Sequence, residues 1–190
     1  MRVRAVLNCK LAVAGVFCFM LALVLANCGA AEKAQKGHMQ LTSTAFNQGA
    51  PIPTKHTCDD KNVSPPLKWN GVPEAAKSLV LIADDPDAPV GTWVHWVPHD
   101  LPASASELPE DVPKSQSVPG GGKQGVNDFK LLGYGGPCPP SGKPHRYFFK
   151  LYALDVQLDL KPGATRKEVE HAMGTHILAH AELMGTYKRK

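Results

Sequence analysis

Side chains that can bind a small anion are concentrated in two stretches of this 190-residue sequence. Asp85 ends an apolar run and opens the motif DPDAP, and His95 follows in the motif WVHW. His145 and Tyr147 stand together about fifty residues later, in the motif HRY. Imidazole and phenol groups donate hydrogen bonds, and a nearby carboxylate fixes the tautomer of a histidine and raises its proton affinity. Brought together, these side chains would form a site for a phosphate-type group.

Three apolar segments are expected to position these side chains. Residues 78–83 read as a buried strand that ends in carboxylates and prolines, which places polar groups at the edge of a sheet. Residues 93–101 read as the next strand, in which Pro98 marks an edge, a bulge or an early end. Residues 147–154 form the strongest strand of the chain, because they are aromatic and nearly continuous in apolar character.

The remaining segments indicate a β-rich α+β domain. Residues 41–46 alternate as a strand does, and residues 103–125 read as a long excursion rich in proline and glycine. Thr165 and Glu168 form a capping box for a helix that ends near Met173. We expect a second helix over residues 176–184, broken by the glycine at position 185.

Four motifs, in the right order and with the right gaps, resemble the phosphatidylethanolamine-binding protein family, in its bacterial Raf-kinase-inhibitor-like branch. They are DPDAP, WxHW, GYxGPCPP and HRYxFxxYALD. The likeness spans residues 41–187, and it implies a large antiparallel Greek-key-type sheet, a smaller sheet and C-terminal helices. It also implies a ligand-binding pocket whose residues correspond to Asp85, His95, His145 and Tyr147, with Pro86, Cys138 and Pro139 at its wall.

The N-terminal segment has the composition of a secretion signal. Basic residues at positions 2, 4 and 10 precede an uncharged apolar run over 11–26, which is short for a membrane span. Residues 25–28 resemble a bacterial lipobox, although Asn27 departs from its usual small residue; cleavage after the cluster at 29–31 is the alternative. We therefore expect a signal peptide over 1–27, a lipid anchor at Cys28, a flexible spacer over 28–40 and one domain over 41–190, exported to the periplasm or cell envelope.

Cysteine usage agrees with an oxidising compartment. Once the signal and Cys28 are set aside, Cys58 and Cys138 remain. They are candidates for a disulfide, and two free thiols near the pocket are the alternative. The resemblance to secreted members of the family implies that the two residues are bonded to each other.

The charge of the mature chain argues against binding to nucleic acid and against electrostatic binding to anionic lipid. The first 27 residues carry three basic and no acidic residues, so 21 − 3 = 18 basic residues face 17 acidic ones and leave a charge of +1. A nearly neutral chain has no electrostatic footprint for nucleic acid and no polybasic patch for anionic lipid.

The sequence supports catalysis or metal binding less well than it supports ligand binding. His176 and His180 have the i, i+4 spacing of helical metal ligands, but the acidic partner of a zinc-protease motif is missing. No Gly-x-Ser-x-Gly motif is present, and the glycine run at 120–122 lacks phosphate-loop spacing. We therefore expect neither a metal nor a cofactor, and no enzymatic activity.

The combined prediction is an exported, non-enzymatic binding protein. Its partners would be a small anionic ligand or phospholipid headgroup, and the membrane through the N-terminal lipid. The alternative is a protein-interaction or inhibitor module, of the kinase- or protease-inhibitor type, that acts on an envelope partner. A hydrolase is the third possibility.

Overall fold

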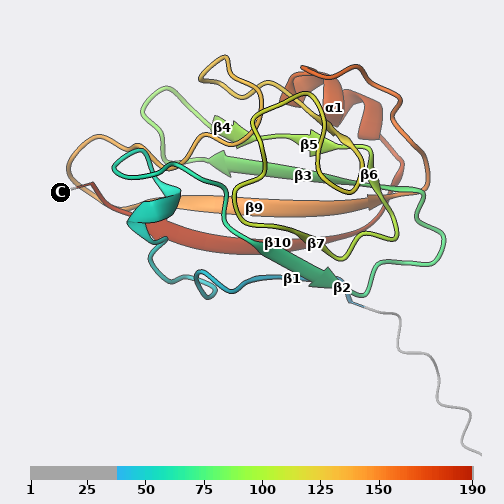
Figure 1. Ribbon diagram of the computed structural model, residues 1–190, viewed down its shortest axis with the longest axis horizontal. Coiled ribbons are helices and arrows are strands. Elements are labelled where there is room, and N and C mark those ends of the chain that lie inside the picture. Colours follow the sequence, from blue (N-terminus) through green and yellow to red (C-terminus); the bar gives the residue numbers. More distant parts are fainter. Residues whose placement is uncertain (1–37, 190) are drawn as a thin grey trace, which may run out of the picture. The chain divides into compact units, whose positions relative to one another are not determined.

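An antiparallel sheet carries the residues of interest. In the computed structural model, which describes residues 38–189, β3 (Ser78–Asp85) lies between β9 (His145–Leu154) and β4 (Trp93–Trp96). The long strand β10 (Ile177–Tyr187) forms the opposite edge beside β9, and the short β6 (Leu101–Pro102) also pairs with β3 (Figure 1). The predicted signal segment and lipid site at residues 1–28 lie outside the described residues.

The sequence of β3 explains its central place. All eight of its residues are buried, as expected for a continuous apolar run with neighbours on both faces. Leu79 and Leu81 belong to one core cluster, whereas Val80 and Ile82 belong to a second cluster on the other face. The second cluster is completed by Val169 and other residues of α1 and its flanking loops, so the helix covers that face of the sheet.

A smaller sheet packs against the first core cluster. It is formed by β1 (Gln40–Ser43), β2 (Leu67–Asn70) and β7 (Glu107–Leu108), in the order β1-β2-β7. Leu67 and Trp69 of β2 join the same cluster as Leu81 and Phe149 of the large sheet. Met39 is also buried, so the described domain begins before residue 41, where we placed its start.

Two further short elements complete the described chain. A two-stranded sheet pairs β5 (Pro98–His99) with β8 (Lys123–Gln124), and a 3-10 helix covers Thr54–His56. The predicted strand over 93–101 is therefore divided into β4, β5 and the start of β6. Pro98 begins a separate strand, as its missing amide donor led us to expect.

The helix α1 (Arg166–Met173) confirms the predicted capping box. The Thr165 side chain accepts a hydrogen bond from the Glu168 amide, and the Glu168 carboxylate accepts one from the Thr165 amide. Each bond satisfies a backbone donor that the first helical turn leaves unpaired, which fixes where the helix starts.

The predicted second helix is wrong, because residues 177–187 form β10. Its odd-numbered residues from Ala181 onward are buried and its even-numbered residues are exposed or half-buried, which is the period of a strand. Gly185 does not end a helix; a Cβ there would lie 2.5 Å from Ile52 and 2.8 Å from Phe46, so the bare backbone makes room for both side chains.

The same correction removes the helical histidine pair. His180 lies on β10 with its ring 6.3 Å from that of Tyr152, and His176 pairs with Asp155 at 2.8 Å. The β-rich α+β fold class and its antiparallel sheets are confirmed, with a single α-helix within residues 38–189.

Candidate ligand pocket

A small pocket lies where β3 ends, β9 begins and β4 passes beside them. Its volume is about 180 Å³. Its lining combines one carboxylate and two imidazoles with proline, aromatic and small apolar side chains: Asp85, Ala88, Pro89, Val90, Trp93, His95, Phe129, Cys138, Pro139, Pro140 and His145. The pocket therefore brings together Asp85, His95, Cys138, Pro139 and His145, which the sequence nominated from separate stretches.

Asp85 and His145 form the polar end of this pocket. The antiparallel register of β3 and β9 places the last residue of one strand near the first residue of the other. His145 Nδ1 donates to Asp85 Oδ2 at 2.8 Å, and Asp85 Oδ1 accepts from the Asp87 amide at 2.8 Å. Because Nδ1 is occupied, Nε2 of His145 remains for a ligand. The His145 side chain is 12% exposed, so this end of the pocket is open to solvent.

His95 has a different partner. Its Nδ1 donates to the carbonyl oxygen of Gly135, which fixes the tautomer and leaves Nε2 as an acceptor in the neutral ring. Burial lowers the pKa of His95 below the ordinary value of 6.5, although the Gly135 hydrogen bond and the Asp85 carboxylate act in the opposite direction. Asp85 thus acts on the pKa of His95 in the expected direction, but burial outweighs it and the net shift is downward.

Tyr147 lies behind the wall of the pocket. It follows His145 by two residues on β9, and its ring meets the His95 ring edge-on at 5.2 Å between centroids. Burial raises the pKa of the phenol, and the nearby Asp85 carboxylate adds to the effect, so the group stays protonated. Its hydroxyl is buried and makes no well-formed hydrogen bond within residues 38–189. The Asp85 carboxylate is an acceptor within reach of this donor, and its interaction with the hydroxyl contributes to the raised pKa.

Pro86 does not line the pocket. The residue is exposed at the turn after β3, next to Asp87. Asp87 is held by Arg146, whose Nε and Nη2 lie 2.9 and 2.7 Å from its carboxylate oxygens. Hydrogen bonding by Arg146 lowers the pKa of Asp87 to about 2. This ion pair fixes the turn, but it leaves no permanent cation in the described lining.

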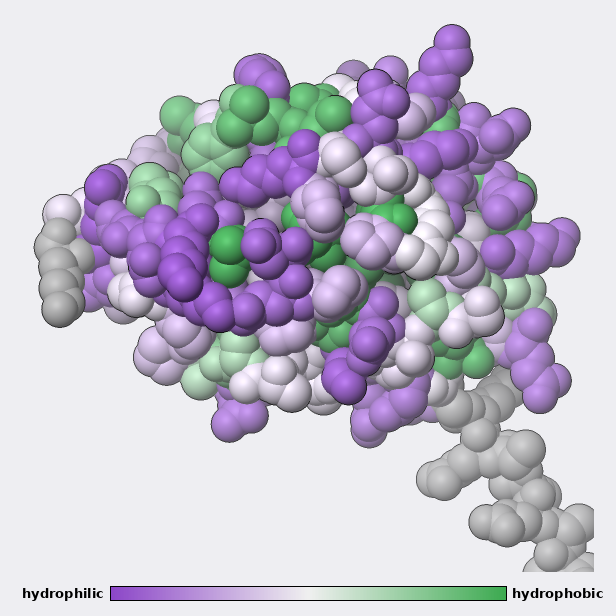
Figure 2. Space-filling view, viewed as in Figure 1, coloured by the Kyte–Doolittle hydropathy of each residue, from purple (hydrophilic) through white to green (hydrophobic). Residues whose placement is uncertain are grey.

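Sequence reasoning missed the apolar part of the lining. Phe129 packs edge-on against Trp93 and His95, with ring centroids 5.4 and 5.5 Å apart. Phe129 is 37% exposed and Val90 is 79% exposed, so the mouth of the pocket is apolar. Figure 2 shows apolar surface gathered at the upper left, where the loops beside β4 lie in Figure 1. Gly135 makes room for this ring, because a Cβ there would lie 2.6 Å from Phe129, and no pattern in the sequence indicates this contact.

The predicted disulfide between Cys58 and Cys138 is confirmed. It joins the loop after the 3-10 helix to the pocket wall, with a Cα–Cα distance of 5.4 Å. Two hydrogen bonds run beside it: the Cys58 amide donates to the Pro137 carbonyl at 3.0 Å, and the Gly136 amide donates to Asn62 Oδ1 at 2.7 Å. The wall that carries Cys138 is thus tied to the body of the domain.

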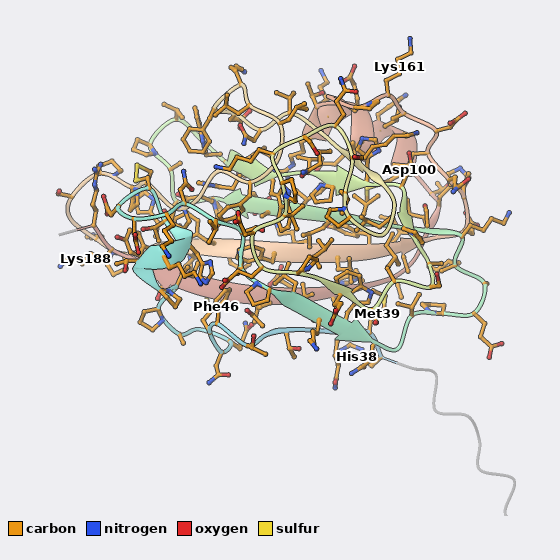
Figure 3. The ribbon with its side chains drawn as sticks, in the orientation of Figure 1. His38, Met39, Phe46, Asp100, Lys161 and Lys188 are labelled. Carbon is orange, nitrogen blue, oxygen red and sulfur yellow. A yellow bond between two sulfur atoms is a disulfide. The ribbon has the colours of Figure 1, made fainter. Side chains whose placement is uncertain are left out.

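A larger groove lies elsewhere and has different chemistry. Its volume is about 640 Å³, and it runs between β1 and residues 180–183 of β10. His38, Met39 and Phe46, all labelled in Figure 3, are among its lining residues. None of the predicted site residues contributes to it, so size and predicted chemistry point to different places, and the converging polar groups favour the smaller pocket.

Two features are absent from the described part of the chain. Within residues 38–189 no group of three or more His, Cys, Asp or Glu side chains is arranged to hold a metal ion. Within the same range no helix is long and apolar enough to span a bilayer.

Comparisons with known proteins agree with this fold. A sequence model of the family described as phosphatidylethanolamine-binding protein matches residues 42–188. A UPF0098 protein of Methanothermobacter thermautotrophicus is 54% identical over 151 residues, which cover 80% of this chain and 99% of the relative. A UPF0098 protein of Aquifex aeolicus is 55% identical over 153 residues, covering 80% of this chain and 89% of the relative.

Two crystal structures share the architecture. CT736 of Chlamydia trachomatis, described as a homologue of phosphatidylethanolamine-binding proteins, matches with a TM-score of 0.74 at 45% identity, over 81% of this chain and 99% of its own. Escherichia coli YbcL matches with a TM-score of 0.74 at 35% identity, over 80% and 99%. The chain belongs to the phosphatidylethanolamine-binding protein family.

Proposed function

We propose that this protein is an exported, non-enzymatic binding protein whose pocket holds a phosphate-type group. The observation that carries the proposal is the convergence of Asp85, His95 and His145 in one pocket, with the buried Tyr147 hydroxyl behind it. His145 Nε2 is available to contact a phosphate oxygen, and it donates a hydrogen bond when His145 is protonated. The family name of the relatives supports binding of a phospholipid headgroup.

The charge of the pocket lining restricts the chemical class of the ligand. The described lining contains no Lys or Arg, and His95 has a lowered pKa, so the pocket offers little positive charge to a dianion. Neutral His95 presents an acceptor at Nε2. A ligand that combines one anionic oxygen with a hydrogen-bond donor suits this site better than a bare dianion. A phospholipid headgroup and a protonated phosphomonoester both have this combination.

The apolar mouth of the pocket suggests what kind of group is attached to the phosphate. Val90, Trp93 and Phe129 surround the entrance, so a group attached to the phosphate would contact apolar side chains as it leaves the pocket. Binding without turnover is favoured because the described lining contains no Ser, Thr or Lys, and Cys138 is bonded to Cys58. A disulfide sulfur is not a thiolate nucleophile.

The proposed location rests on the sequence and on the disulfide. The basic and apolar N-terminal segment has the pattern of a secretion signal, and Cys28 would carry a lipid anchor to the membrane. The bond between Cys58 and Cys138 suits the periplasm or cell envelope, because reducing compartments keep most thiols free.

One observation favours a second function. Val90 and Phe129 are exposed apolar side chains at the mouth of the pocket, and a protein partner would cover such a surface. The protein would then be an interaction or inhibitor module, and the pocket would accept a group of its partner.

The proposed function is tested by calorimetric titration of the mature protein. Inorganic phosphate, phosphoethanolamine and a short-chain phosphatidylethanolamine are the probes. His95→Ala and His145→Ala are each expected to weaken binding by roughly tenfold or more, because each removes a hydrogen bond to a charged group. His176→Ala, which changes an exposed histidine outside the pocket lining, is the matched control and should bind as the wild type does.

The three probes separate the outcomes. Tighter binding of the lipid than of phosphoethanolamine would show that the apolar mouth contributes. Equal binding of both would indicate a phosphorylated small molecule. Binding of no probe by the wild type, or equal binding by the wild type and both pocket variants, would contradict the proposal and favour the interaction module.

A further inference from the structure

Cys138 of the Cys58–Cys138 disulfide belongs to the pocket wall and is an exposed residue. Cys138 is exposed and lines the pocket, whereas Cys58 is half-buried behind it. An external thiol that attacks this disulfide therefore reaches Cys138 first. The two sulfurs differ in access before any charge is considered.

The charges around the two sulfurs differ in the same sense. Arg189 Nη1 lies 3.8 Å from Cys138 Sγ, whereas the Asp59 carboxylate stands beside Cys58, with Oδ1 3.9 Å from Cys58 Sγ. Arg189 is held in place because its Nε donates to Asp59 Oδ1 at 2.9 Å. Tyr187 anchors the other oxygen of Asp59 at 2.6 Å. A cation thus stands beside the exposed sulfur and a carboxylate beside the half-buried one.

This arrangement favours thiol–disulfide exchange at Cys138. An incoming thiolate is an anion, so the Arg189 guanidinium attracts it to Cys138 and Asp59 repels it from Cys58. A cation near a cysteine also stabilises its thiolate, which helps Cys138 to leave in a second exchange. In the first exchange the same effect opposes attack at Cys138, because Cys58 must then leave beside Asp59, so the proposed site of attack rests on the exposure of Cys138 and on the attraction of the incoming anion. The attraction and the thiolate stabilisation both depend on the same arginine.

We propose that Cys138 is a thiol-exchange site that takes anionic monothiols and dithiol reductants. In the first step a thiolate R–S⁻ attacks Cys138 Sγ, the R–S bond to Cys138 forms, and Cys58 leaves as a thiolate that takes a proton from water. With a monothiol the product is a mixed disulfide at Cys138. With a dithiol, its second thiolate attacks the sulfur bound to Cys138. Cys138 then leaves as a thiolate, and the reductant becomes a cyclic disulfide.

The site has a consequence for the pocket, and this part rests on the proposed function. The hydrogen bonds at Gly136 and Cys58 survive cleavage of the disulfide, so the wall stays tied down as far as Pro137. An adduct on Cys138 would stand at the pocket wall, opposite Asp85 and the two histidines. The bound thiol would therefore obstruct the phosphate-type ligand.

The test measures reaction of the mature protein with glutathione, an anionic monothiol. The released thiol is alkylated with N-ethylmaleimide at mildly acidic pH, which slows further exchange, and peptides are mapped by mass spectrometry. We expect glutathione on Cys138 and the alkyl group on Cys58. Arg189→Ala should slow the reaction by roughly three- to tenfold, and Arg189→Lys should retain most of the rate because the charge remains.

Lys188→Ala provides the matched control. Lys188, labelled in Figure 3, is an exposed cation one residue from Arg189, and no contact with either sulfur is recorded for it. Its loss should change the rate less than twofold. Adducts on Cys58 alone, or equal rates for Arg189→Ala and Lys188→Ala, would overturn the proposal.

A second measurement separates this proposal from the proposed function. Phosphoethanolamine is titrated into the unmodified protein and into the glutathione adduct. Loss of binding only in the adduct supports the obstructed pocket, and unchanged binding contradicts it. Absence of binding in the unmodified protein would count against the proposed function, and the effect of Arg189 on the exchange rate would still decide the exchange site.

Discussion

The two histidines of the pocket lie in different environments, because their rings donate hydrogen bonds to different acceptors. His145 donates a hydrogen bond to the Asp85 carboxylate at the open end of the pocket. His95 donates to a backbone carbonyl and is buried, which lowers its pKa. The pocket therefore contains one imidazole beside an anion and one that is held neutral. This difference is set by surroundings that no residue type reveals.

The lowered pKa of His95 predicts a loss of stability in acid. Below a pH of about 6.5 the unfolded chain protonates this histidine while the folded protein does not, so the free energy of unfolding falls as pH falls toward the folded pKa. His95→Asn, whose amide can still donate to the Gly135 carbonyl, should reduce that slope by up to about 1.4 kcal/mol per pH unit. Urea unfolding from pH 7.5 to 4.5 measures it.

His99 provides the internal control for this comparison. Burial also lowers the pKa of His99, against the effect of Asp100, and it is present in both proteins. The difference between wild type and variant therefore isolates His95. Identical slopes for the two proteins would show that His95 is protonated in the folded state.

Site residues at the ends of strong strands could be predicted from the sequence, whereas those in loops could not. Asp85 and His145 stand at the ends of the two strongest strands, so their meeting follows from antiparallel pairing. Phe129 was missed because it lies in a loop without periodicity, between no recognisable strands. Pro86 was misplaced because a motif does not show which of its residues face inward.

At the scale of the element, β10 shows where local preference misleads. Residues 177–184 include Ala, Leu, Glu and Met, which favour helices, and this preference predicted one. Pairing with nine consecutive residues of β9, from His145 to Ala153, outweighs it. The alternation of buried residues from Ala181 to Tyr187 was a signal for a strand. Whether such a segment forms a helix or a strand depends on a pairing strand that is distant in the sequence, and the sequence alone does not identify that strand.

Gly185→Ala distinguishes a strand from a helix at this position. In an exposed helix the change would stabilise the protein by roughly 0.5–1 kcal/mol. In β10 the added Cβ meets Ile52 and Phe46 at 2.5 and 2.8 Å, so we expect a loss of about 1–3 kcal/mol. Thermal or urea unfolding measures the effect. Glu182→Ala, on the exposed face of the same strand, should change stability by less than about 0.5 kcal/mol.

At the scale of the whole molecule, the disulfide closes a loop with a sequence separation of 80 residues. Cys58→Ser combined with Cys138→Ser should lower the free energy of unfolding by about 2–4 kcal/mol, because the unfolded chain regains conformational freedom. Urea unfolding of the double variant beside the wild type measures the loss. Equal stability of the two proteins would show that the hydrogen bonds beside the disulfide suffice to hold the wall.

The order of strands in the large sheet also sets when the domain can fold. Leu79 of β3 pairs with Ala153 of β9, 153 − 79 = 74 residues later, and β10 closes the edge with the last strand of the chain. Pairings of such high contact order form slowly, and the edge formed by β10 cannot close until residue 187 has left the ribosome. A chain exported as proposed would therefore remain unfolded throughout synthesis, the state in which a translocation channel accepts it.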